Sequence, residues 1–162
     1  MKHFHVNKMS KRKPYNQRTD LEKIRSQWVK LSGLHSREEW SAAVVRAATA
    51  AEIAANLAIR KEFEENSQFN QKLVDHFLKW ANGLDGKLKN LLLPMLTGQD
   101  KHESIKKICN SAKVINDKRN GIVHRGEFCD EKEATELIDK SKIFILTLVE
   151  PYEKNFSLTE ID

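Results

Sequence analysis

The 162-residue sequence has few residues of the kinds that break helices, build sheets or form disulfide frameworks. It contains three prolines, six glycines and two cysteines, and aromatic side chains make up only 7% of it. Ala, Leu, Ile, Lys and Glu dominate instead, which favours helices over strands. Cys109 and Cys129 are isolated and have no histidine at ligand spacing, so they indicate neither a zinc site nor a disulfide framework. We therefore expect no metal and no other cofactor.

Long apolar segments are also lacking. No apolar run approaches the 18 residues that a membrane span needs, and the N-terminus lacks the apolar core of a secretion signal. Two isolated cysteines fit a reducing compartment. The sequence therefore predicts a cytoplasmic protein that does not contact a membrane.

The charge of the chain is unevenly distributed. The formal net charge is +5, but six basic residues and no acidic ones lie in residues 1–18, which leaves 22 basic against 23 acidic residues in the remainder. We interpret residues 1–18 as a basic flexible tail before a nearly neutral body. Such a tail suits transient contact with phosphates and equally suits a solvated end, so net charge does not decide the function.

Helix starts are predicted from capping boxes, in which a short polar side chain caps the first turn and a Glu three residues later reaches back. The sequence contains three such boxes: Thr19 with Glu22, Ser36 with Glu39, and Asp130 with Glu133. They predict helices that end near residues 31, 65 and 152.

Weaker signals fill the remaining segments. Ser67 is expected to cap a helix that runs to Trp80, and residues 82–86 read as a turn cluster. A short helix is expected over residues 87–95, and another begins near His102. One helical domain would thus cover residues 19–156, and residues 157–162 would form a C-terminal tail.

Side-chain patterns in these segments indicate buried faces. The segment from Trp40 to Phe63 is rich in alanine, which lets neighbouring helices approach closely. In the last helix, small and apolar residues recur at steps of three and four, the pattern of one buried stripe: Ala134, Ile138, Ser141, Ile145, Leu148 and Tyr152. The predicted fold is all-α, an antiparallel, up-and-down helical bundle of about five to six helices.

The helix that begins near His102 carries the most informative pattern. A single arginine, Arg119, shares one face with five apolar residues at alternating steps of three and four: Ile105, Ile108, Ala112, Ile115 and Ile122. A desolvated guanidinium needs a partner or a ligand, whereas an arginine at the edge of the face extends its charge to water. Periodicity alone leaves both interpretations open.

His124 follows five residues after Arg119. At about 100° per residue the two lie roughly 140° apart around a straight helix, so they do not share a face. Asn120 does share a face with His124, and Gly121 between them weakens the helix by about 1 kcal/mol relative to alanine. Gly126 is a natural C-terminal stop. Either the helix distorts near Gly121, where a second backbone or a sugar-phosphate chain could come close, or Arg119 bends toward a groove that His124 borders.

The sequence Arg119-Asn120, three further residues, His124 and then Arg125-Gly126 resembles the signature of HEPN ribonucleases, an Arg and a His separated by four to six residues. Here the spacer is four residues. The alanine-rich long helix before the motif and the capped amphipathic helix after it also resemble the family's bundle, over residues 19–155. The place of the motif near the end of the penultimate helix strengthens the resemblance.

The resemblance implies metal-independent cleavage of single-stranded RNA by a homodimer that brings two motifs together across a cleft. Attack by the ribose 2′-hydroxyl on its phosphate needs one proton removed and one returned, which suits His124 as the acid/base. Arg119 would stabilise charge on the phosphate oxygens through bidentate hydrogen bonds. Asn120 would hold the imidazole or the phosphate, and Arg125 would add a phosphate contact.

Two further groups of residues lie outside the motif. Glu52, Asn56 and Arg60 form a line at steps of four along the alanine-rich helix, and such a line either faces the cleft and orients His124 or is solvated surface. Glu52 and Asn56 are therefore candidate supporting residues. The three tryptophans are interpreted as core or interface aromatics: Trp28, Trp40 and Trp80.

Three functional classes follow. The first is an endoribonuclease of a toxin or antiviral-defence type, with RNA, a second copy of the chain and an antitoxin or other regulatory protein as partners. The second is a non-catalytic HEPN-like module that binds RNA, a nucleotide or a protein partner through the same cleft, and the third is a helical dimerisation module. Some HEPN toxins carry a Tyr two residues after the His, where a nucleotidyltransferase antitoxin modifies them; Gly126 stands there in this chain, which argues against that mode of control.

Overall fold

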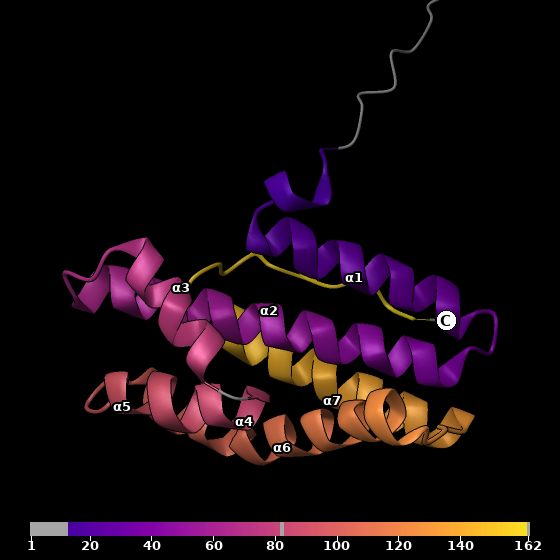
Figure 1. Cartoon of the computed structure of the whole chain (residues 1–162). Coiled ribbons are helices and arrows are strands. Elements are labelled where there is room, and N and C mark those ends of the chain that lie inside the picture. The colour runs from indigo at the N-terminus through magenta and orange to yellow at the C-terminus, as the bar shows by residue number, and fades with distance from the viewer. Residues whose placement is uncertain (1–12, 82, 162) are drawn as a thin grey trace, which may run out of the picture.

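The computed structural model describes residues 13–81 and 83–161, and these residues form helices and connections without a strand (Figure 1). The helices of ten residues or more are α1 (Asp20–His35), α2 (Trp40–Asn66), α3 (Gln71–Trp80), α6 (Lys101–Arg125) and α7 (Glu131–Val149). Between α3 and α6 lie three short elements: α4 (Gly83–Lys87), the π-helical turn η2 (Leu88–Leu92) and α5 (Leu93–Met95). A 3-10 turn, η1 (Tyr15–Gln17), precedes α1. The predicted all-α fold is confirmed.

Helix α2 lies at the centre of this helical bundle. It contacts α1, α3, α4, α6 and α7, and Figure 1 shows α1 on one side of it and α6 and α7 on the other. The small side chains of α2 allow close approach from both sides, because the distance between packed helices depends on the side chains at the contact. Seven of its alanines are fully buried: Ala43, Ala47, Ala50, Ala51, Ala54, Ala55 and Ala58.

Helix α2 is also long and apolar enough to cross a membrane by length and composition. Its most apolar 18-residue window has a mean hydropathy of 1.4. The expectation from the sequence considered only uninterrupted apolar runs and therefore did not include such a segment. However, 61% of that window is buried inside the protein. Packing against the other helices therefore accounts for the apolar composition of α2.

The predicted buried faces of the last two long helices are confirmed except at their ends, because Ile122 and Tyr152 are only partly buried and α7 ends at Val149. In α6 the apolar seam from Ile105 to Ile115 is buried, whereas Arg119, one step further along the same face, is partly exposed. In α7 the predicted stripe is buried from Ala134 to Leu148. The apolar seam of α6 thus ends where the Arg-x4-His motif begins.

Two of the three predicted capping boxes cap their helices. At α1, the hydroxyl of Thr19 accepts from the N–H of Glu22 (3.2 Å), and the Glu22 carboxylate accepts from the N–H of Thr19 (2.7 Å). At α7, the side chain of Asp130 accepts from the N–H of Glu133 (2.8 Å). Both helices begin where the sequence predicted.

Two other predicted helix starts are wrong. Ser36 closes α1, because its hydroxyl donates to a carbonyl of the last turn (3.0 Å), and α2 begins at Trp40 without a side-chain cap. Ser67 likewise closes α2, where its hydroxyl donates to a backbone carbonyl (2.7 Å), and Asn70 caps α3. A serine hydroxyl both donates and accepts hydrogen bonds. It therefore suits either end of a helix, and sequence spacing does not distinguish the two.

The predicted turn at residues 82–86 is also wrong for the part that is described. Residue 82 lies outside the described residues, and Gly83 begins a helical stretch that continues to Met95. Gly83 has a φ of +71°, in the left-handed region that favours glycine. The stretch that starts here contacts both α2 and α6. Gly83 therefore lies at the start of a segment that packs against both helices.

Both ends of the described chain pack against α1. Residues 1–12, most of the predicted basic tail, lie outside the described residues. Arg18 donates to the hydroxyl of Ser26 (2.8 Å) and so attaches residues 13–18 to α1. The indole of Trp28 donates to the carbonyl of Thr159 (3.0 Å), and Leu158 is buried. The segment that follows α7, yellow in Figure 1, therefore returns along α1.

The carboxylate of Glu62 in α2 is fully buried. It accepts hydrogen bonds from the Tyr152 hydroxyl (2.5 Å) and from Gln99 (3.3 Å). It also accepts from Asn66 (2.9 Å) and forms an ion pair with Lys101. Burial alone would raise the pKa of Glu62, but the hydrogen bonds, first of all from Lys101, outweigh burial and lower it. This cluster, the Glu62 network, joins α2 to the start of α6 and to the segment after α7.

Candidate active site

The Arg-x4-His motif occupies the C-terminal turns of α6. Gly126 has a φ of +69° and ends the helix in the left-handed conformation. The N–H of Glu127 then donates to the carbonyl of Gly121 (3.1 Å). Gly126 is therefore the helix stop that the sequence predicted, and α6 is helical as far as Arg125.

Arg119 and His124 meet although a straight helix places them on different faces. The distance between Arg119 Nη1 and His124 Nε2 is 3.3 Å. Because α6 continues without a break through Gly121, the contact arises from the long Arg119 side chain, which reaches around the helix. Of the two alternatives that the sequence left open, the structure has the bent side chain and not the distorted helix.

The nature of the contact depends on the tautomer of the imidazole. A guanidinium carries only N–H donors, so the contact is a hydrogen bond only when Nε2 of His124 carries no proton. An unprotonated ring nitrogen that is released from Arg119 can act as a general base. His124 is exposed and Arg119 is partly exposed, so both side chains are reachable from solvent.

Asn120 positions the arginine. Its side-chain oxygen accepts from Arg119 Nη1 at 2.9 Å, whereas the sequence assigned Asn120 to the imidazole or to a phosphate. The contacts with Asn120 and His124 both use Nη1. The guanidinium has further N–H groups on Nη2 and Nε, and these are the groups that can bind an anion in a bidentate manner.

The role of Gly121 differs from the expected one. A Cβ atom at this position would overlap the carboxylate of Glu127 and would lie 2.9 Å from Arg125 Nη2. Arg125 Nε donates to Glu127 at 2.9 Å, so this ion pair lies over the bare backbone of Gly121. The space predicted for a second backbone is thus filled by the chain's own side chains. Arg125, which was assigned to a phosphate, is paired with Glu127.

A cavity of about 290 Å³ adjoins the motif, and we call it the Arg119 cavity. It brings together three of the predicted site residues, Glu52 from α2 and Arg119 and Asn120 from α6. His124 is not among its lining residues, whereas Asn116 is. Sequence reasoning missed Asn116, although its position three residues before Arg119 and four before Asn120 places it on their side of α6.

Glu52 is held at the edge of this cavity by an ion pair. Lys87 Nζ lies 2.7 Å from Glu52 Oε1, and the Lys87 side chain is buried whereas that of Glu52 is half exposed. The pair fixes the carboxylate where α2 meets α4. Among the described residues Glu52 makes no hydrogen bond or ion pair with His124, so it does not orient the imidazole directly.

The other residues of the predicted line lie further from the motif. Asn56 lines a neighbouring cavity of about 500 Å³, which shares Glu52 with the Arg119 cavity. Arg60 forms ion pairs with Asp20 (2.9 Å) and Asp75 (3.0 Å). Neither Asn56 nor Arg60 lines the Arg119 cavity, and Arg60 joins helices instead.

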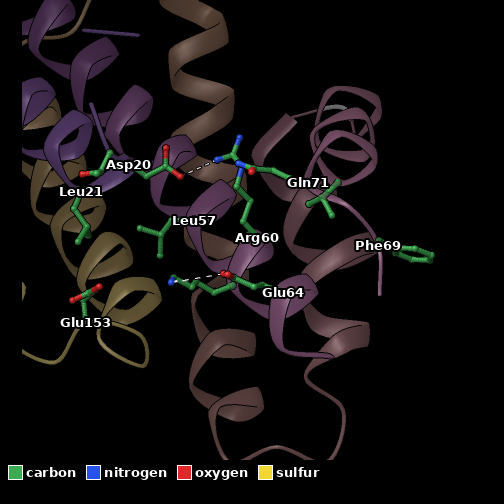
Figure 2. Close-up of a pocket in the computed structure, with 11 residues that line it drawn as sticks. Asp20, Leu21, Leu57, Arg60, Glu64, Phe69, Gln71 and Glu153 are labelled. Atoms are coloured by element: carbon green, nitrogen blue, oxygen red, sulfur yellow. Dashed lines mark hydrogen bonds and ion pairs between the residues drawn. The ribbon is translucent and has the colours of Figure 1, made fainter. Parts of the chain in front are cut away.

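A larger cavity, of about 570 Å³, lies near the other end of α2 (Figure 2). Figure 2 shows that Asp20, Arg60 and Glu64 surround it. Four of its charged groups form pairs, Arg60 with Asp20 and Lys61 with Glu64 (3.9 Å). Its lining includes no histidine and no residue of the motif, so it is the smaller Arg119 cavity that adjoins the predicted chemistry.

The described residues offer no second constellation for catalysis by metal or thiol. They contain no group of three or more His, Cys, Asp or Glu side chains that could hold a metal ion. Cys109 and Cys129 are buried, and burial raises the pKa of both thiols. Both cysteines therefore remain protonated at neutral pH and are poor nucleophiles.

The interpretation of the tryptophans is only partly correct. Trp28 is buried at 1% exposure, as a core residue should be, but Trp80 at the end of α3 is 82% exposed. The core interpretation of Trp80 is therefore wrong. Its assignment to an interface stays a prediction.

Comparison with protein-family models, with curated proteins and with solved structures found no match to this chain. The HEPN resemblance thus stays a prediction from the motif and its place in the helices.

Proposed function

We propose that this protein is a metal-independent endoribonuclease of a toxin or antiviral-defence type, which cleaves single-stranded RNA in the cytoplasm. The observation that carries the proposal is the 3.3 Å contact between Arg119 Nη1 and His124 Nε2 at a solvent-accessible helix end. It joins a positioned cation to an imidazole. Transfer of a phosphodiester needs both, one for the charge on the phosphate oxygens and one for the proton.

In the proposed reaction His124 removes the proton of the ribose 2′-hydroxyl, and the 2′-oxygen attacks the adjacent phosphorus. The bond from phosphorus to the 5′-oxygen breaks, and an imidazolium returns a proton to that oxygen. The products are a 2′,3′-cyclic phosphate and a 5′-hydroxyl. Arg119 donates from Nη2 and Nε to the non-bridging oxygens as their charge increases.

A second copy of the chain would supply the second imidazole. The attacking and leaving oxygens lie on opposite sides of the phosphorus, so one His124 does not easily serve both. A two-fold homodimer of antiparallel, up-and-down bundles would place two motifs across one cleft. Two exposed apolar residues near the motif, Val123 (45% exposed) and Phe128 (86%), support a partner surface here. An antitoxin or other regulatory protein would bind the same end.

The exposed Phe128 also favours a second candidate, a non-catalytic HEPN-like module that binds RNA, a nucleotide or a protein partner. An aromatic side chain in solvent suits binding whether or not a reaction follows. This candidate predicts RNA binding without turnover.

Incubation of the purified protein with single-stranded RNA in EDTA tests the proposal. We expect cleavage to continue in the chelator, because the motif supplies an acid/base and a cation of its own, and we expect the fragments to end in cyclic phosphate. End-group analysis by mass spectrometry measures this. Binding without fragments would favour the non-catalytic module, and cleavage that stops in EDTA would contradict the proposed mechanism.

A further inference from the structure

The Arg119 cavity has the size of a site for one small planar group. Its volume of about 290 Å³ lies at the lower limit of small-molecule sites, which span about 300–1,000 Å³, and therefore suits a ligand no larger than one nucleobase. Ala48, Leu84 and Ile115 contribute apolar surface to its wall. Most of the exposed wall is nevertheless polar, and polar groups at fixed positions are what gives a binding site its specificity.

The polar groups of the cavity come from two helices. On the α6 side, Asn120 is engaged by Arg119, and Asn116 lies beside it in the wall. On the α2 side, Lys87 binds only Oε1 of Glu52. Oε2 of Glu52 and the side-chain amide of Asn116 are therefore available to recognise a ligand, beside Thr49 and Arg119, which also line the cavity.

Gly83 packs against the Asn116 amide. A Cβ atom at Gly83 would lie 3.4 Å from Asn116 Nδ2 and 3.7 Å from its Oδ1, and the φ of +71° disfavours any other residue. Backbone and not a side chain thus lies beside Asn116, which lines the cavity. A side-chain amide can make two hydrogen bonds to one edge of a base.

The charges of the wall determine whether a base or a phosphate binds in the cavity. The carboxylate of Glu52 repels an anion, whereas Arg119 attracts one. A phosphate bound between Arg119 and His124 would leave the adjoining nucleoside to reach toward Glu52 and Asn116. The cavity is therefore better suited to the base than to the backbone of an RNA.

We infer that the Arg119 cavity is a subsite for one nucleobase of RNA, and that Glu52 and Asn116 select a base with an exocyclic amino group over uracil. The inference rests on the proposed endoribonuclease function. A carboxylate only accepts hydrogen bonds, so Glu52 pairs with the N4 amino group of cytosine and repels O4 of uracil. Asn116 pairs with the amino group and the ring nitrogen beside it.

Cytosine and uracil form a matched test pair, because they have the same size and differ at this edge. Two pairs of single-stranded substrates are cleaved in parallel. In one pair the nucleotide on the 5′ side of the scissile phosphate is cytosine or uracil, and in the other pair the nucleotide on the 3′ side is. We expect the wild type to cut the cytosine substrate about 10-fold faster at one of these positions. Asn116→Ala should reduce this ratio to below about threefold, whereas Asn110→Ala, an exposed asparagine of α6 outside the cavity, should keep it.

A binding arm separates this inference from the proposed function. Uncleavable all-deoxy strands with the same base change are titrated by fluorescence anisotropy, with circular dichroism to verify that the Asn116→Ala variant is folded. A cytosine preference that depends on Asn116 but without any cleavage would support the subsite and overturn the ribonuclease. Cleavage with equal rates for both bases, or a ratio that survives Asn116→Ala, would overturn the subsite alone. Absence of both cleavage and preference would overturn both.

Discussion

Replacement of His124 by alanine should lower the rate of RNA cleavage by about 10²–10⁴-fold, the usual contribution of a general acid or base. The imidazole is exposed, and its hydrogen bond is to Arg119. Its removal should therefore leave the free energy of unfolding within about 0.5 kcal/mol of that of the wild type. Single-turnover rates and thermal unfolding of the same preparations measure the two effects.

A second histidine of α6 provides the matched control. His102 lies at the other end of the helix, where it contacts Glu103 (3.0 Å), and His102→Ala should cleave RNA at the wild-type rate. Equal cleavage by the wild type and His124→Ala would show that the activity comes from a contaminant. If His124→Ala instead weakened dimer affinity or stability and left RNA binding unchanged, the motif would belong to a dimerisation module.

Replacement of Glu62 by alanine should have the largest effect on stability. Glu62 is fully buried and paired with Lys101, whose side chain is also largely buried. Removal of one partner from a buried pair leaves an uncompensated charge and costs about 3–5 kcal/mol. For a chain of this length that corresponds to a decrease in Tm of roughly 6–20 °C. Calorimetry or thermal circular dichroism measures it.

The Glu62 network should also make stability depend on pH. Because the pKa of Glu62 is lowered in the folded protein, the unfolded state binds more protons in acid. The stabilisation by this carboxylate should be present above its ordinary pKa near 4.5 and should be lost as the pH falls through the lower folded value.

Glu65→Ala, at an exposed position of the same helix, should change Tm little. Equal Tm values for Glu62→Ala and Glu65→Ala would contradict this account of the network.

The features that the sequence predicted correctly depend on neighbours within one helix. The buried seam of α6 from Ile105 to Ile115 and the caps at Thr19 and Asp130 follow from periodicity and short spacing. The stop at Gly126 follows from the one residue that adopts a left-handed conformation without strain.

The features that the sequence did not predict depend on residues distant in the chain. Glu62 is buried because Gln99 and Tyr152 arrive from 37 and 90 residues away. Asn116 belongs to a cavity wall only because Gly83 and Glu52 lie beside it. Spacing along α2 does not reveal the burial of Glu62, and spacing along α6 does not reveal the place of Asn116 in the cavity.

The geometry of the Arg-x4-His motif was predicted only in part. Helical spacing correctly placed Arg119 and His124 on different faces, but it fixes Cβ directions and not the path of a long side chain. The guanidinium crosses that separation and also bonds to Asn120. The positions of Arg119 and His124 on α6 were thus predictable, whereas the contact between them was not.

The most direct test of the central claim, that Arg119 and His124 cleave RNA through the 2′-hydroxyl, is a DNA strand that contains one ribonucleotide. In EDTA, the wild type should cut this strand only after the ribonucleotide and leave a cyclic phosphate, whereas folded Arg119→Ala and His124→Ala should leave it intact. Cleavage at deoxynucleotides, or equal cleavage by the wild type and both variants, would contradict the account.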